Sequence, residues 1–178
     1  MSIRDFYGDW AGYNRRFTDT VRGLGASDLA IHVPGSEDWP IWATVGHMAG
    51  MRVYWLCVVA GEPGADRTPF ADVASAGWED DLDRPRGVDE LVGALDSTWQ
   101  VIEATLDRWT TPMLSEAVER DAANGRQRHT RQSILLRLQY HEAYHAGEIN
   151  VALKANGREL FDPWPSADWT IDPPGGAS

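Results

Sequence analysis

Residues 130–157 read TRQSILLRLQYHEAYHAGEINVALKANG, and this stretch decides the expected fold. Apolar side chains recur in it at steps of three and four residues, which is the spacing of one face of an α-helix. The stripe consists of Ile134, Leu138, His141, His145, Ile149 and Ala152. Thr130 is a helix-capping residue type, and Asn156-Gly157 is typical of a helix end. We therefore expect one long helix with two imidazoles, one turn apart, on its inward face.

Three further helices are expected from similar spacing of apolar residues. They should cover residues 3–24, 40–60 and 88–109. The segment 61–87 has repeated glycine and proline without a sustained period, so we expect a long crossover with a short helical turn.

Between the third helix and the last one, apolar residues become sparse and Asn124-Gly125 favours a tight turn. A small hairpin is therefore expected there. Arg126, Arg128 and Arg131 surround His129, and we expect them to form a solvated edge of this hairpin; the alternative is that they receive an anionic group of a substrate. The tail, residues 158–178, is rich in proline, so it should be extended; Trp164 and Trp169 predict that the tail packs along the body.

The length and composition suit one domain. A chain of 178 residues that is 43% hydrophobic can fill one core, so we assign residues 1–178 to a single domain. Four amphipathic helices without a convincing set of strands predict an all-α protein, a four-helix bundle with a long crossover and a small hairpin before the last helix.

The charge and cysteine content narrow the partners and the location. The net charge of −11 disfavours binding to nucleic acid or to an anionic membrane surface. No secretory leader or membrane span is visible, and the single Cys57 excludes an internal disulfide framework. We expect a cytoplasmic protein that acts on a small molecule.

A third histidine lies on the second expected helix. His47, Met51, Tyr54 and Val58 follow one another at steps of four, three and four, which predicts that His47 faces the core. One inward histidine on one helix and an inward pair on another can supply three ligands to a metal ion with an open fourth position. The sequence therefore predicts a site for one divalent metal at His47, His141 and His145.

Several motifs resemble the DinB/YfiT-like superfamily of metal-binding four-helix bundles, which includes mycothiol- and bacillithiol-dependent enzymes. The resemblance rests on Trp39 eight residues before His47, the continuation His47-Met-Ala-Gly, the segment His141-x-x-x-His145-Ala-Gly-Glu-Ile followed by Asn156-Gly157, and the Asp162-Pro-Trp164 ending. It covers most of the chain. Pro40 departs from the pattern, since relatives often have a helix-capping serine or threonine there.

The resemblance implies that His47, His141 and His145 bind one divalent ion, commonly zinc or nickel, with water or substrate at the remaining position. Relatives are often dimers, so a homodimer is also expected. A metal held by three neutral imidazoles keeps its double positive charge and promotes deprotonation of a bound thiol or water. We therefore expect an enzyme that uses a low-molecular-weight thiol as co-substrate, either a thiol S-transferase acting on small electrophiles or a thiol-dependent isomerase.

Two alternatives remain open from the sequence. A non-catalytic protein that binds and sequesters a metal or a small molecule would need the same histidines. The segment from His141 to His145 also matches the H-E-x-x-H pattern of zinc hydrolases, in which Glu142 would activate water, but Glu148 and Val151 break the longer form of that pattern. Since Glu142 lies about 100° around the helix from His141, we expect a solvated or helix-packing carboxylate, with support of the ligands from behind as a second role.

Overall fold

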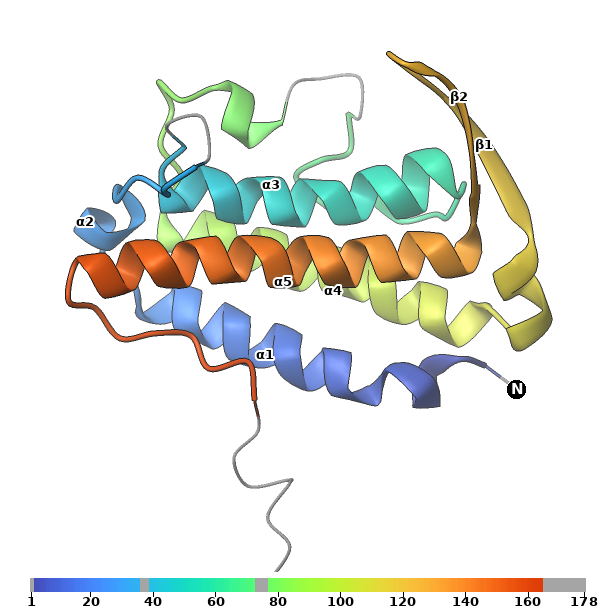
Figure 1. Cartoon of the computed structure of the whole chain (residues 1–178), viewed down its shortest axis with the longest axis horizontal. Helices are drawn as coiled ribbons and strands as arrows, with labels where there is room; N and C mark the ends of the chain where they lie inside the picture. The colour runs from blue at the N-terminus through green and yellow to red at the C-terminus, as the bar shows by residue number, and fades with distance from the viewer. Residues whose placement is uncertain (1, 36–38, 73–76, 165–178) are drawn as a thin grey trace, which may run out of the picture.

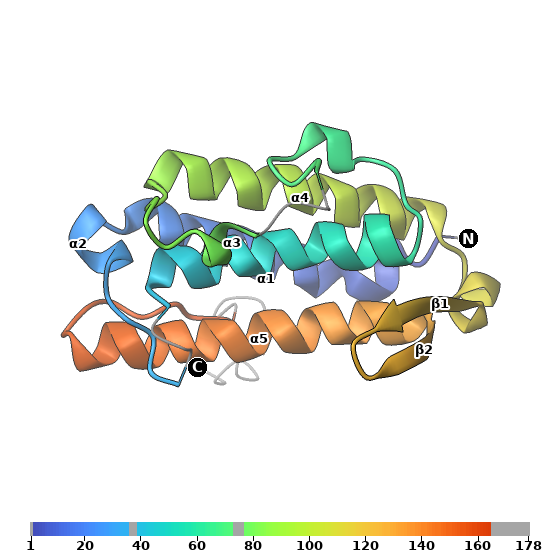
Figure 2. The ribbon, with the colours of Figure 1, turned by 90° about the horizontal axis from the view of Figure 1, so that it is seen from above.

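The computed structural model describes residues 2–35, 39–72 and 77–164. This part of the chain is mostly helical and contains one two-stranded antiparallel sheet. The longer helices are α1 (Gly8–Gly23), α3 (Ile41–Val53), α4 (Val88–Arg108) and α5 (Arg131–Ala155). They run alongside one another in two perpendicular views, with the sheet at one end (Figures 1 and 2). The expected helical class and the expected small hairpin are both present.

Two helices are less regular than expected. The first begins with a 3-10 turn at Arg4–Tyr7 and becomes α-helical only from Gly8. The second helix changes after Val53 into a π-helix at Tyr54–Val59. A short helix, α2 (Ala26–Leu29), occupies part of the segment expected to be a loop.

The long crossover between α3 and α4 lies against the outer face of α3. It contains two 3-10 turns, η3 (Ala65–Arg67) and η4 (Trp78–Asp80). A Cβ atom at Gly46 of α3 would lie only 3.2 Å from the Trp78 side chain, so the glycine permits this close approach. The approach brings Glu79 over α3 beside His47, where the two side chains meet.

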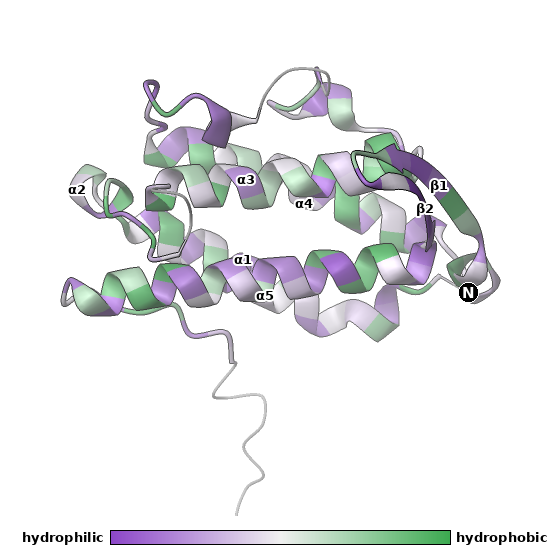
Figure 3. Ribbon diagram, turned by 45° about the horizontal axis from the view of Figure 1, so that its top comes forward, coloured by the Kyte–Doolittle hydropathy of each residue, from purple (hydrophilic) through white to green (hydrophobic). Residues whose placement is uncertain are grey.

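The hairpin between α4 and α5 joins β1 (Ala117–Ala122) to β2 (Gly125–Thr130). Ala122 pairs with Gly125, so the turn residues are Ala123 and Asn124 and not the expected pair Asn124-Gly125. Gly125 instead opens β2 with a φ of 111°, a backbone conformation that favours glycine. Strongly hydrophilic residues run along this hairpin (purple in Figure 3).

The expected stripe of α5 is largely buried. Ile134, Leu138, Ile149 and Ala152 are at most 2% exposed. Thr130 caps the helix by accepting a hydrogen bond from the Ser133 amide, as expected. The described part of the tail packs along the body, as expected: Phe161 is buried in the core and Arg16 donates a hydrogen bond to the Pro163 carbonyl, although the Trp164 side chain itself is 71% exposed. Trp169 and residues 165–178 lie outside the described residues. Among the described helices, none has the length and apolarity that a bilayer crossing requires.

Candidate metal centre

The three predicted histidines meet at the edge of the interface between α3 and α5. His47 comes from α3, and His141 and His145 come from adjacent turns of α5. The Nε2 atom of His141 lies 2.9 Å from that of His47 and 3.1 Å from that of His145. One nitrogen from each of the three rings lies within 4.8 Å of the corresponding nitrogens of the other two. The structure therefore brings together the residues that the sequence proposed as ligands.

In two of these rings a carboxylate is hydrogen-bonded to Nδ1, the outer nitrogen, which points away from the cluster. Glu79 Oε1 lies 2.6 Å from His47 Nδ1, and Glu148 Oε2 lies 2.7 Å from His145 Nδ1. An ionised carboxylate only accepts hydrogen bonds, so each Nδ1 donates its N–H and each Nε2 keeps a lone pair that points to the centre of the cluster. This arrangement of carboxylate, histidine and open nitrogen is the usual support for metal-binding histidines.

His141 completes the cluster without a carboxylate. Its Nδ1 atom is buried and has no hydrogen-bond partner among the described residues. Burial, helped by the neighbouring His145 and His47 and by Arg137, lowers its pKa to about 3, so the ring is neutral at pH 7. Burial also lowers the pKa of His145. A neutral His141 ring has one N–H. If it is on Nε2, it faces the lone pairs of both His47 and His145, and Nδ1 still has no hydrogen-bond partner among the described residues.

A divalent cation fits this donor set. Three imidazole nitrogens facing one point are the ligand supply of a tetrahedral site with one open position. Zinc bonds of 2.0–2.1 Å would place the nitrogens about 3.4 Å apart, so the distances from His141 Nε2 to His47 Nε2 and to His145 Nε2 need to lengthen by only a few tenths of an ångström. The side chains of His47, His141 and His145 therefore suit a metal.

The site opens at the rim of the molecule and not in the middle of its core. The His47 side chain is 16% exposed and that of His145 is 10% exposed. The expected His47 stripe lies at the edge of the core: Met51 and Tyr54 are half-buried and pack against core residues, whereas Val58 is 47% exposed. The ring of Trp39 lies 5.0 Å from that of His47, and the ring of Tyr144 lies 5.1 Å from that of His145.

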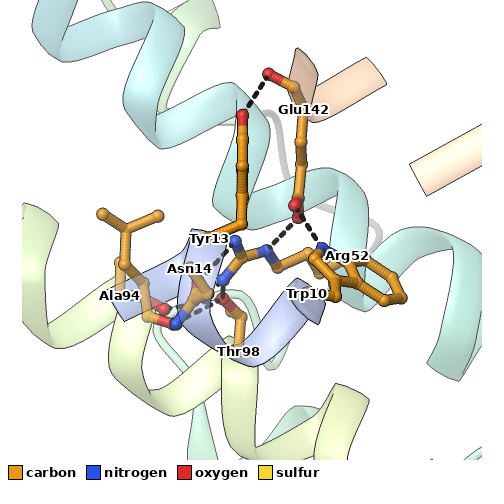
Figure 4. A network of polar contacts seen from close by, with 8 residues as sticks. Trp10, Tyr13, Asn14, Arg52, Ala94, Thr98 and Glu142 are labelled. Atoms are coloured by element: carbon orange, nitrogen blue, oxygen red, sulfur yellow. Dashed lines mark hydrogen bonds and ion pairs between the residues drawn. The ribbon is translucent and has the colours of Figure 1, made fainter. Parts of the chain in front are cut away.

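Glu142 belongs to a different cluster, shown in Figure 4. It is only 1% exposed, so the expectation of a solvated carboxylate was wrong, while the helix-packing alternative holds. Its two oxygens accept hydrogen bonds from Arg52 Nε at 2.6 Å and from Trp10 Nε1 at 2.7 Å. Arg52 also donates to Asn14 Oδ1 and to the Leu95 carbonyl, so the network joins α1, α3, α4 and α5. These contacts occupy both carboxylate oxygens and do not support a water-activating role for Glu142.

Sequence analysis missed three charged residues that shape these clusters. Arg52 is the only charged residue in the apolar stretch 41–60, and this isolation was a signal for a buried partner. Glu148 lies three residues after His145, which places the two side chains on one helix face. Glu79 lies in the aperiodic crossover, 32 residues from His47, and no local pattern indicates it.

A separate cavity of about 380 Å³ lies between α1, α5 and the tail. On α5 it is lined by Gln139, Glu142, Ala143, Ala146, Gly147 and Asn150. None of the three clustered histidines lines it. The cavity therefore does not contain the histidine cluster.

Comparison with known proteins identifies the family and the fold of this chain. The model of the DinB superfamily matches residues 13–149. The chain belongs to the DinB superfamily. Among solved structures, a DinB-like protein from Bacillus cereus aligns with this DinB-superfamily chain with a TM-score of 0.66 and 16% sequence identity, over 89% of this chain and 95% of that one. No curated protein matches the chain. At this identity the structural likeness supports the fold alone.

Proposed function

We propose that this DinB-superfamily protein is a divalent-metal-dependent enzyme that transfers a low-molecular-weight thiol to small electrophiles, or uses the thiol to isomerise them. One observation carries the proposal: three Nε2 atoms converge, and two of the three rings are held by carboxylates at their outer nitrogens. Zinc and nickel are the proposed ions, because both accept imidazole ligands. We also propose a bundle packing of the four long helices and a cytoplasmic location.

The chain's own residues would prepare the site for this chemistry. Glu79 and Glu148 hold two ring N–H groups and so keep the lone pairs of His47 and His145 directed inward. Because the ligands are neutral, a bound divalent ion would keep its charge and lower the pKa of a thiol or water that binds to it. A thiolate present at neutral pH is the nucleophile that S-transfer requires.

The surroundings of the cluster suit a small organic ligand. Trp39 and Tyr144 contribute aromatic rings beside the histidines. The hydroxyl of Tyr144 is hydrogen-bonded to Glu148, and this interaction raises its pKa, so the hydroxyl stays protonated at neutral pH. Tyr144 is 62% exposed and can therefore contact a ligand that enters from solvent.

The first test is the metal content of protein purified without chelator and without a nickel affinity resin. Close to one ion per chain is expected, and a folded double variant, His141→Ala with His145→Ala, should contain none. The wild type should then consume electrophilic test substrates with candidate thiols only when the metal is present. A wild type that contains no metal and refuses added zinc and nickel would overturn the proposal.

Further outcomes separate the alternatives. Saturation at one equivalent of ligand, with the ligand recovered unchanged and no turnover, would indicate sequestration. Glu142→Gln should leave thiol transfer largely intact, whereas a zinc hydrolase would lose its activity. The homodimer remains a prediction of the family resemblance; sedimentation of the purified protein at several concentrations tests it.

A further inference from the structure

Two arginines near the histidine cluster lack an acidic partner in the described part of the chain. The protein has 27 acidic and 16 basic residues, so an unpaired arginine is unexpected. Arg120 donates hydrogen bonds to neutral groups, the Gln127 side-chain oxygen and the Tyr54 hydroxyl. Arg137 is exposed, and the contact described for its guanidinium is with an aromatic ring. Within the described residues, neither charge is neutralised.

Both guanidinium groups stack on the same indole. The central carbon of Arg137 lies 4.6 Å from the Trp55 ring centroid, and that of Arg120 lies 4.7 Å from it. The His129 ring lies 5.0 Å from the same indole. Cation–π contacts attract each arginine to the ring, but the two like charges repel each other. An anion bound by either guanidinium would reduce this repulsion.

This cationic pair, Arg120 and Arg137, lies along the same strip of surface as the histidines. Arg137 precedes His141 by four residues, so it lies on the same face of α5 about 6 Å along the helix axis. Trp55 lies two turns after His47 on the other side of the strip. The hairpin, which carries Arg120, stands at this end of α3 and α5 (Figures 1 and 2). The strip of surface between α3 and α5 therefore carries the histidine cluster and, next to it, two arginines without acidic partners among the described residues.

The neighbouring arginines of the hairpin region differ from this pair. Arg126 forms an ion pair with Glu119 at 2.8 Å, and Arg131 pairs with Glu116 at 3.4 Å and with Glu62 at 3.7 Å. Their charges are neutralised within the fold. Arg128 also has no acidic partner among the described residues, but strand alternation places it on the other side of the hairpin. On the side that faces Trp55, the arginine charge without an acidic partner is that of Arg120 and Arg137.

We propose that the strip between α3 and α5 binds a small molecule that bears a carboxylate, which Arg120 and Arg137 hold while the other end of the molecule reaches the histidine cluster. That the other end of the molecule binds at the histidine cluster rests on the proposed function. Arginine forms paired, charge-assisted hydrogen bonds with a carboxylate, and the donors of Arg137 are free to do so. A neutral ligand would leave both cations unpaired.

A series of ω-mercaptocarboxylates of three to six carbons, each compared with its neutral ω-mercaptoamide, tests the proposal. Binding is measured on cobalt-loaded protein, whose absorption spectrum reports a new thiol ligand. For at least one chain length the acid should bind about tenfold more tightly than the amide, the size expected for a charge-assisted hydrogen bond. Arg137→Gln and Arg120→Gln should each remove most of that preference.

Arg128→Gln is the matched control. It removes one positive charge from the same hairpin, but strand alternation turns residue 128 away from the side on which Gln127 and His129 contact Arg120 and Trp55. It should therefore keep the acid preference. Equal binding of acids and amides, or equal loss in all three variants, would overturn the proposal even if thiols bind and the proposed function stands.

A second measurement keeps the two proposals separable. Glutarate, which has no thiol, is titrated into metal-free protein by calorimetry and compared with the Arg137→Gln variant. If no thiol binds the loaded protein but glutarate binds and depends on Arg137, the thiol chemistry fails and the carboxylate site stands. If glutarate binding is absent or unaffected by the substitution, and the mercapto acids show no preference, the carboxylate site fails.

Discussion

His141 and Glu142 are adjacent on α5, yet they belong to two polar clusters that differ in one respect. Around Glu142, the described groups satisfy one another: the carboxylate accepts from Arg52 and Trp10, and Arg52 reaches three helices. Around His141, lone pairs face one another and the outer nitrogen of that ring has no partner among the described residues. The network around Glu142 is complete within the fold, whereas the cluster around His141 has nitrogens that could still bind a ligand.

The largest expected effect comes from breaking the completed network. Arg52→Met leaves the Glu142 carboxylate buried without its cation, which should lower the free energy of unfolding by about 3–5 kcal/mol in urea titrations. Arg22→Met, which removes an exposed pair with Asp19, should cost less than about 1 kcal/mol. A loss for Arg52→Met no greater than that of this control would contradict a structural role for the network.

Breaking the incomplete cluster should instead remove a response to metal. Zinc or nickel at about one hundred times its dissociation constant should stabilise the wild type by about 2.7 kcal/mol. His141→Ala should abolish this gain while changing the stability of the metal-free protein little. His32→Ala, at an exposed histidine outside the cluster, should retain the gain. Metal-induced stabilisation that survives in His141→Ala would remove the distinction between the two clusters.

The carboxylates behind the histidines should have an intermediate effect. Glu79→Gln keeps the size of the side chain but removes the charge that holds the His47 N–H, so metal affinity should fall about 10–100-fold. Competition with a chromophoric chelator measures this change. Asp81→Asn, an exposed acid in the same crossover, is the control and should leave the affinity unchanged. Equal affinities for Glu79→Gln and the wild type would show that Glu79 does not support the ligand.

The smallest effect concerns acidity in the metal-free protein. Burial lowers the pKa of His141 and His145 in the folded state, so below the ordinary value of about 6.5 the unfolded chain binds more protons than the folded one. Stability should therefore be fully present above pH 6.5 and fall on acidification, by somewhat less than about 1 kcal/mol per histidine at pH 6. Urea midpoints measured from pH 8 to pH 5 follow the change.

The control for this pH dependence is a matched pair of variants. His141→Gln should flatten the pH profile, because it removes one group that resists protonation in the fold. His32→Gln should leave the profile unchanged. A wild-type midpoint that is constant from pH 7 to pH 5 would contradict the burial of neutral imidazoles.

The candidate metal ligands could be predicted from the sequence, whereas most of the residues that surround them could not. The two α5 histidines were predictable because four residues on a helix return to the same face, whatever surrounds that helix. The burial of Glu142 was not, because its cation, Arg52, lies 90 residues away on another helix. The arginines without acidic partners were also not predictable, since the nearby Arg126 and Arg131 differ from them only in having Glu119, Glu116 and Glu62 within reach.

The sequence by itself therefore determined the helical class, the hairpin and the choice of the three histidines as candidate metal ligands, because these depend on local spacing and turn chemistry. Tertiary structure alone decided that Glu79 supports His47, that Glu142 joins a buried network, and that Arg120 and Arg137 share one indole. The physical reason is that hydrogen bonds and ion pairs depend on distances of about 3 Å between atoms. In this chain those distances join helices, a crossover and a hairpin that local periodicity describes only one at a time.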